Sequence, residues 1–139
     1  MKIAYPYTME PQKDGGYLVQ FVDLAEAYTE GATEEEAAFN AQEVLSLVLE
    51  QRLADDGVIP RPSRTDGLPL AAPDAVIQSA LLIQGAREEE QKSLADLARA
   101  LGTSWPSAAR LEDPRHWPSL RQLDRAAAAL GKRLVLTLE

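Results

Sequence analysis

The spacing of apolar residues changes at Thr33, and this change limits what the first half of the chain can fold into. Before Thr33, large apolar side chains occupy alternate positions in two short runs: Ile3, Tyr5, Tyr7, Tyr17, Val19 and Phe21. A period of two predicts half-buried strands. The Asp14–Gly16 turn between the runs supplies glycines for a hairpin, and a short third strand is expected over Ala27–Thr29. These features indicate an antiparallel meander.

After Thr33 the period becomes that of a helix. Thr33 is a favourable N-cap, and Glu36 stands three residues later, as in a capping box. Apolar residues then recur at helical spacing: Ala37, Ala41, Val44, Leu45, Val48 and Leu49. The helix is expected to end near Asp56, with Gly57 at its C-terminal cap and Val58–Ile59 as one more short strand. The order predicted for this half is β-β-β-α-β.

A stretch rich in proline, glycine and small polar residues follows this half and predicts an exposed connection. We place a first domain over residues 1–62, a linker over 63–73 and a second domain over 74–139. The expected fold class is α+β, because the second domain has helical periodicity almost throughout.

Four helix starts are expected in the second domain, at Asp74, Ser93, Ser104 and Ser119. The short helices that begin at Ser93 and Ser104 meet at Gly102, an arrangement typical of a helix-turn-helix. The second helix of such a pair enters the major groove of DNA. The residues expected to contact DNA are Lys92, Ser93, Thr103, Ser104, Trp105, Ser107, Arg110 and Arg115.

The last residues alternate again. Leu134, Leu136 and Leu138 are separated by Val135 and Thr137, which predicts a strand over 133–138. An isolated strand leaves its backbone groups unpaired. We therefore expect the three leucines to contribute to dimerisation through pairing with a second copy of the chain, as a homodimer or a tetramer.

Charge and composition limit the partners. The net charge is −8, and residues 1–64 hold twelve acids and five bases, whereas residues 91–133 hold eight bases and four acids. This asymmetry indicates one surface for a cationic partner and another for an anionic one. With no cysteine and a single histidine, His116, a thiolate or imidazole metal cage is excluded, and no cofactor is expected. Without a signal peptide or an apolar run that could span a bilayer, the expected location is the cytoplasm and no membrane partner is expected.

Several segments together resemble the HicB antitoxin family. They are Gly16–Leu24 (GYLVQFVDL), Glu30–Ala37 (EGATEEEA), Leu97–Gly102 (LARALG), Arg110–His116 (RLEDPRH) and Leu123–Leu134 (LDRAAAALGKRL). Their order and spacing extend the resemblance over nearly the whole chain apart from the linker. The chain departs from the family pattern at Val22 and Ala25-Glu26, where prolines and a glycine are usual, and at Leu94 and Trp105-Pro106 in the helix-turn-helix.

The resemblance implies a partial RNase H-like N-terminal fold that occludes a HicA-type toxin, a small protein that cleaves mRNA. It also implies a C-terminal domain that binds operator DNA as a dimer and regulates its own operon. An acidic surface would attract a basic toxin. The residues expected on that surface are Asp23, Glu26, Tyr28 and Glu30.

Two other classes of function stay open at this stage. The first is a two-metal nuclease using Asp14, Asp23, Glu26 and Glu30, which would require these carboxylates to converge. Because Asp14 belongs to a turn and the others to a strand edge, we favour a protein that is not an enzyme and holds no metal. The second is a transcriptional regulator whose N-terminal half senses a small ligand.

Overall fold

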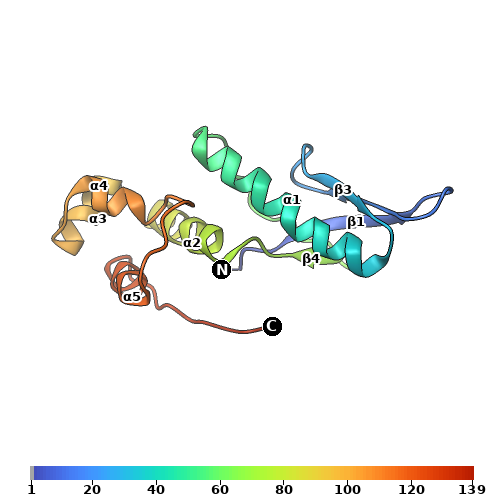
Figure 1. Ribbon diagram of the computed structural model, residues 1–139. Coiled ribbons are helices and arrows are strands. Elements are labelled where there is room, and N and C mark those ends of the chain that lie inside the picture. Colours follow the sequence, from blue (N-terminus) through green and yellow to red (C-terminus); the bar gives the residue numbers. More distant parts are fainter. Residues whose placement is uncertain (1) are drawn as a thin grey trace. The chain divides into compact units, whose positions relative to one another are not determined.

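The computed structural model describes residues 2–139 and resolves them into two compact units, one ending at Ile77 and the other beginning at Gln78 (Figure 1). The first unit is an antiparallel sheet with one long helix, and the second consists of short helices. The expected α+β class is confirmed. No helix within residues 2–139 combines the length and the apolar character needed to cross a bilayer.

Four strands form the sheet of the first unit in the order β3-β2-β1-β4. They are β1 (Tyr5–Pro11), β2 (Tyr17–Phe21), β3 (Tyr28–Gly31) and β4 (Leu70–Ala71). All neighbouring pairs are antiparallel. The first three strands are the predicted meander, and the turn at 12–16 closes the hairpin between β1 and β2.

The helix α1 (Glu34–Ala54) covers one face of this sheet. It begins where the sequence predicts, because the Thr33 hydroxyl accepts a hydrogen bond from the Glu36 amide at 3.1 Å. Contact with β3 is very close: a Cβ added to Gly31 would lie 2.3 Å from the backbone nitrogen of Ala37. The face of the sheet that carries Gly31 is therefore the one that meets α1.

The core of the first unit forms on that face. Tyr7 pairs with Phe21 across β1 and β2, and their rings lie 5.3 Å apart. Side chains on alternate positions point to the same side of a sheet. The largest fully buried residues of this unit include Tyr5, Val19, Phe21, Leu24, Leu45 and Leu49.

The fourth strand is not the one predicted. Val58–Ile59 form no strand, and Val58 is 80 % exposed. The carbonyl oxygen of Val58 accepts a hydrogen bond from the Arg52 guanidinium at 2.8 Å, and this bond holds Val58 beside the end of α1. The free edge of β1 is instead paired by Leu70–Ala71, within the segment predicted as a linker, where Tyr5 faces Ala71.

The second unit contains the remaining helices. They are α2 (Ala75–Glu89), which begins in the first unit, α3 (Leu94–Leu101), α4 (Trp105–Arg110) and α5 (Leu120–Ala129). The predicted caps Ser93, Ser104 and Ser119 each accept a hydrogen bond from an amide in the first turn of their helix. The core comprises Ile83, Ala86, Leu97, Ala98, Ala108, Leu111, Leu123, Ala126 and Leu130.

The strand predicted over 133–138 is absent from the single chain described. Leu134 is half-buried against the helical core, whereas Leu136 and Leu138 are exposed. A strand requires a neighbour to take its backbone hydrogen bonds. Pairing of Leu134, Leu136 and Leu138 with a second copy remains a prediction.

Candidate functional site

Two of the carboxylates predicted to face a partner are engaged within their own unit. Asp23 accepts hydrogen bonds from the Ser63 amide at 2.9 Å and from the Ser63 hydroxyl. Glu26 forms a bidentate ion pair with Arg52, with N–O distances of 2.7 and 2.8 Å. The hydrogen bond from Arg52 lowers the pKa of Glu26 below its usual range. Both carboxylates thus secure the turn after β2 to the end of α1 and the segment beyond it.

The other two predicted residues, Tyr28 and Glu30, lie on the edge strand β3. Tyr28 is 61 % exposed, and Glu30 is exposed as well. The backbone carbonyl of Glu30 accepts a hydrogen bond from the Asn40 side-chain amide at 2.8 Å, so α1 fixes the strand. Of the four predicted toxin contacts, these two are the ones presented to solvent without an internal ion pair among the described residues.

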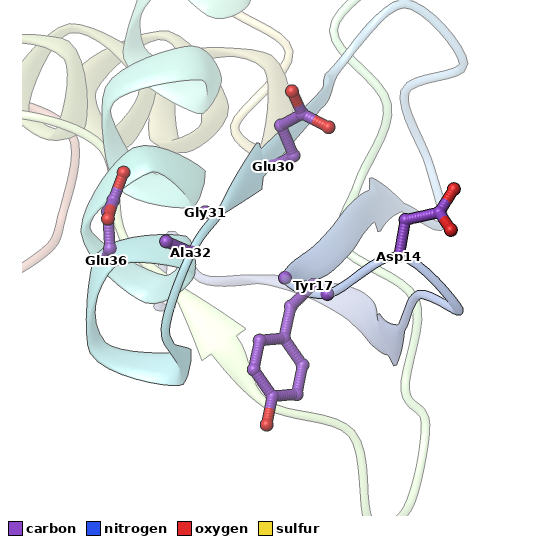
Figure 2. A pocket seen from close by; sticks show the side chains of 8 residues that line it. Asp14, Tyr17, Glu30, Gly31, Ala32 and Glu36 are labelled. Carbon is purple, nitrogen blue, oxygen red and sulfur yellow. The ribbon is translucent and has the colours of Figure 1, made fainter.

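Glu30 also borders an open hollow of about 630 Å³ beside the β1–β2 turn (Figure 2). Asp14 and Glu36 contribute two further carboxylates to its lining, and Tyr17 the one aromatic ring. Figure 2 shows Glu30 and Tyr17 pointing to opposite sides of the sheet, with Glu30 directed away from α1. The hollow is therefore open to solvent and lined by three carboxylates, those of Asp14, Glu30 and Glu36.

The four carboxylates considered for a nuclease do not form one cluster, because Asp14 and Glu30 line the hollow whereas Asp23 and Glu26 are engaged elsewhere. Asp23 and Glu26 are bound to Ser63 and Arg52, while Asp14 belongs to the rim of the hollow. Within residues 2–139, no group of three or more Asp, Glu, His or Cys side chains is placed to hold a metal ion. The described geometry provides no two-metal centre of the kind that nuclease chemistry requires.

Two exposed residues that the sequence reasoning missed, Leu18 and Glu10, lie in the same row of the sheet as Glu30. Leu18 pairs with Glu10 on β1 and with Glu30 on β3, so the three side chains form one row across the sheet. Tyr28 lies in the next row, opposite Gln20. We call Glu10, Leu18, Tyr28 and Glu30 the open sheet face. The available signal that Leu18 points outward was the alternation of Tyr17, Val19 and Phe21, of which Val19 and Phe21 are buried.

Tyr5, at the start of β1, is a buried tyrosine whose hydroxyl pKa is raised by its surroundings. The Tyr5 hydroxyl donates a hydrogen bond to the Pro60 carbonyl at 2.7 Å. Burial, reinforced by the charge of Asp23 and opposed by Arg52, raises the pKa of Tyr5 to about 12. Tyr5 is therefore a neutral structural group that anchors the chain after α1.

The helix-turn-helix of the second unit is formed by α3 and α4. Gly102 ends α3 in the left-handed conformation (φ 64°), and Ser104 caps α4 two residues later. Ala108 and Leu111 are buried, as the sequence predicts. This orientation leaves Arg110 on the solvent side of α4, the helix expected to enter the major groove.

The residues predicted to contact DNA divide by exposure. Thr103, Ser104, Trp105, Arg110 and Arg115 are exposed, and Trp105 is 53 % exposed. Ser93 is exposed too, whereas Lys92 and Ser107 are half-buried, and all three form hydrogen bonds within the unit. Ser107 accepts a hydrogen bond from the Ser104 hydroxyl, the Lys92 ammonium donates to the Ala129 carbonyl, and the Ser93 hydroxyl caps α3.

One ion pair connects Arg87, near the end of α2, to Glu112, two residues beyond the end of α4. Arg87 donates to both carboxylate oxygens of Glu112, at 2.8 and 2.9 Å, and also to the Lys92 carbonyl at 2.9 Å. Only 15 % and 9 % of these two side chains are exposed. The hydrogen bond to Glu112 raises the pKa of Arg87, which keeps its charge. This pair fixes the C-terminal end of α4.

Two arginines on α5 were not among the predicted DNA contacts. Arg121 and Arg125 are exposed and one helical turn apart, and the Arg125 guanidinium donates to the Leu101 carbonyl at 3.3 Å. Arg125 shares a small hollow with Thr103 and Ser107. The sequence signal was their i, i+4 spacing after the Ser119 cap, which places both on one face.

Similarity to known proteins extends over nearly the whole chain. Residues 4–68 match the family model described as HicB_like antitoxin of bacterial toxin-antitoxin system. "Antitoxin HicB" of Escherichia coli K12 is 34 % identical over 142 aligned positions, which cover 98 % of this chain and 99 % of the relative. "Antitoxin HicB 1" of Photorhabdus laumondii is 31 % identical over 99 % of this chain and 88 % of the relative. A Pseudomonas fluorescens "Antitoxin HicB" is 27 % identical over 99 % of this chain.

Proposed function

Because the chain belongs to the HicB-like antitoxin family, we propose that it binds and neutralises a HicA-type toxin that cleaves mRNA. The observation that carries the proposal is similarity to HicB antitoxins over nearly the full length of both proteins. The acidic first unit supports it, since a protein that binds RNA presents cationic groups. The neutralisation requires binding alone and no catalysis, and would take place in the cytoplasm.

Co-expression tests this proposal. A gene for a HicA-type toxin is induced alone, and then together with the full-length antitoxin candidate. Growth arrest by the first and recovery with the second are expected. Arrest that persists although both proteins are made would contradict toxin neutralisation.

We further propose that the second unit binds operator DNA and regulates its own operon, with the toxin complex as the tightest-binding form. The support is a helix-turn-helix with exposed Trp105 and Arg110 on its second helix. Arg110→Ala should weaken operator binding by about 1–3 kcal/mol in an electrophoretic mobility assay. Arg61→Ala, which also removes one exposed arginine but from the first unit, is the matched control. Equal affinity for both variants would contradict the assigned recognition helix.

The DNA-binding form is proposed to be a dimer held in part by the C-terminal residues. Leu136 and Leu138 are exposed on an extended segment, where a second copy of the strand would cover them. Truncation after Gly131 should produce monomers in light scattering at concentrations where the full chain is dimeric. A truncated chain that stays dimeric with unchanged affinity would contradict this arrangement.

A further inference from the structure

The open sheet face combines exposed apolar side chains with carboxylates that form no ion pair among the described residues. The opposite side of the sheet is covered by α1, because Gly31 contacts Ala37 there. On the side that carries Leu18, the sheet is also covered next to β4, because Pro6 of β1 is buried there. The exposed part of this side therefore comprises the residues of β1, β2 and β3 that lie farther from β4.

Strand register makes this face a contiguous patch. Leu18 lies directly between Glu10 and Glu30, and directly opposed side chains have Cβ atoms about 5 Å apart. Tyr28 is the diagonal neighbour of Leu18, at a separation of roughly 7 Å that an aromatic side chain spans. Leu18 is 40 % exposed and Tyr28 61 % exposed. Two apolar groups thus adjoin, with a carboxylate on either side of Leu18.

The charge on this patch has one sign. The four strands contain Glu10 and Glu30 as their charged residues and no lysine or arginine. Among the described residues, neither carboxylate forms an ion pair, in contrast to Glu26 with Arg52. A complementary surface presents cations on both sides of an apolar side chain, as expected of a small basic protein.

A second exposed apolar region lies on α1, but it has a different geometry. Phe39 and Leu47 are 63 % and 66 % exposed. Eight positions separate them, which is roughly 12 Å along a helix. Glu43 lies between them on the same side, so no contiguous apolar contact forms there. This region provides a matched set of control positions.

We propose that the open sheet face is the docking surface for the toxin, with Leu18 and Tyr28 as apolar anchors and Glu10 and Glu30 pairing with basic side chains around its RNA-binding site. This inference rests on the proposed toxin neutralisation and names the surface that performs it. The carboxylates then occupy positions that RNA phosphates would take. Central, desolvated aromatic and apolar anchors dominate binding, whereas peripheral charges mainly control the association rate.

The binding test uses the full-length protein and a HicA-type toxin inactivated by substitution of the catalytic histidine that the family resemblance implies for it. Affinities come from surface plasmon resonance. Leu18→Ala and Tyr28→Ala should each raise Kd at least tenfold, mainly through faster dissociation. Glu10→Lys with Glu30→Lys should slow association and weaken its dependence on salt. Phe39→Ala, Leu47→Ala and Glu43→Lys should stay within threefold of the parent chain.

A second measurement does not depend on loss of affinity. The chain contains no cysteine, so Leu18→Cys and Leu47→Cys each introduce one thiol at an exposed site. The toxin should slow maleimide labelling at position 18 at least tenfold and leave position 47 unaffected. Protection of position 47 instead, or sheet variants that bind like the parent, would overturn this docking surface. Absence of any toxin binding by the parent chain would overturn the proposed function itself.

Discussion

Replacement of Glu112 by glutamine tests how the helix-turn-helix unit is held together. The change preserves the size of the side chain but removes the charge that Arg87 meets through two hydrogen bonds of 2.8 and 2.9 Å. Both side chains are largely buried. Removing one partner of such a pair leaves an uncompensated charge, which typically costs about 3–5 kcal/mol. Because glutamine retains one acceptor oxygen, we expect a loss of roughly 3 kcal/mol in the free energy of unfolding.

Tryptophan fluorescence during urea unfolding reports this unit selectively, because Trp105 and Trp117 are the only tryptophans of the chain. The matched control is Glu89→Gln, which makes the same chemical change in an ion pair with Lys132 whose side chains are 50 % and 37 % exposed. It should cost less than about 0.5 kcal/mol.

The double variant Arg87→Met with Glu112→Leu separates two contributions to the free energy of unfolding: the cost of an unpaired buried charge and the packing of the two side chains. It should recover to within about 1–2 kcal/mol of the parent, since it removes both charges and leaves only the Lys92 carbonyl without its donor. A loss below about 0.5 kcal/mol for Glu112→Gln, equal to the Glu89→Gln control, would refute the reasoning.

Three further outcomes are expected in the first unit. Gly31→Ala should destabilise it by about 3 kcal/mol in thermal unfolding followed by circular dichroism, because the added Cβ meets the Ala37 backbone; a change within error would refute that close contact. Tyr5→Phe should cost about 1 kcal/mol through loss of the hydrogen bond to Pro60, and in an alkaline titration it should remove the phenolate absorbance step near pH 12. Glu26→Gln should cost about 0.5 kcal/mol at pH 7, since the ion pair is partly exposed. The native pKa of Glu26 lies below its ordinary value of 4.5, so the difference between parent and variant should be complete above that pH and vanish as the pH falls through the lowered pKa. A difference that grows on acidification would contradict this sign.

Local chemistry explains why so many helix boundaries were predictable. A cap acts on an amide two or three residues away, so Thr33, Ser93, Ser104 and Ser119 could be identified without any tertiary information. The fourth strand was not predictable in this way. Leu70–Ala71 is only two residues long, and it is a strand because the edge of β1 is free to pair with it.

The site residues show the same division. Asp23 and Glu26 were expected to face a partner, but their bonds to Ser63 and Arg52 span 40 and 26 residues of sequence. Whether a carboxylate is engaged or presented depends on which distant groups the fold brings beside it. Tyr28 and Glu30 are presented, and strand register adds Glu10 and Leu18 to them.

The change of apolar period at Thr33 determined by itself that a meander precedes a long helix, since periodicity and capping act over a few residues. Family membership and the position of the helix-turn-helix could likewise be inferred from short segments and their order. Only the tertiary structure decided which strand completes the sheet, which acids are neutralised internally and which form a contiguous patch. These outcomes depend on contacts between residues far apart in sequence, and no local preference encodes them.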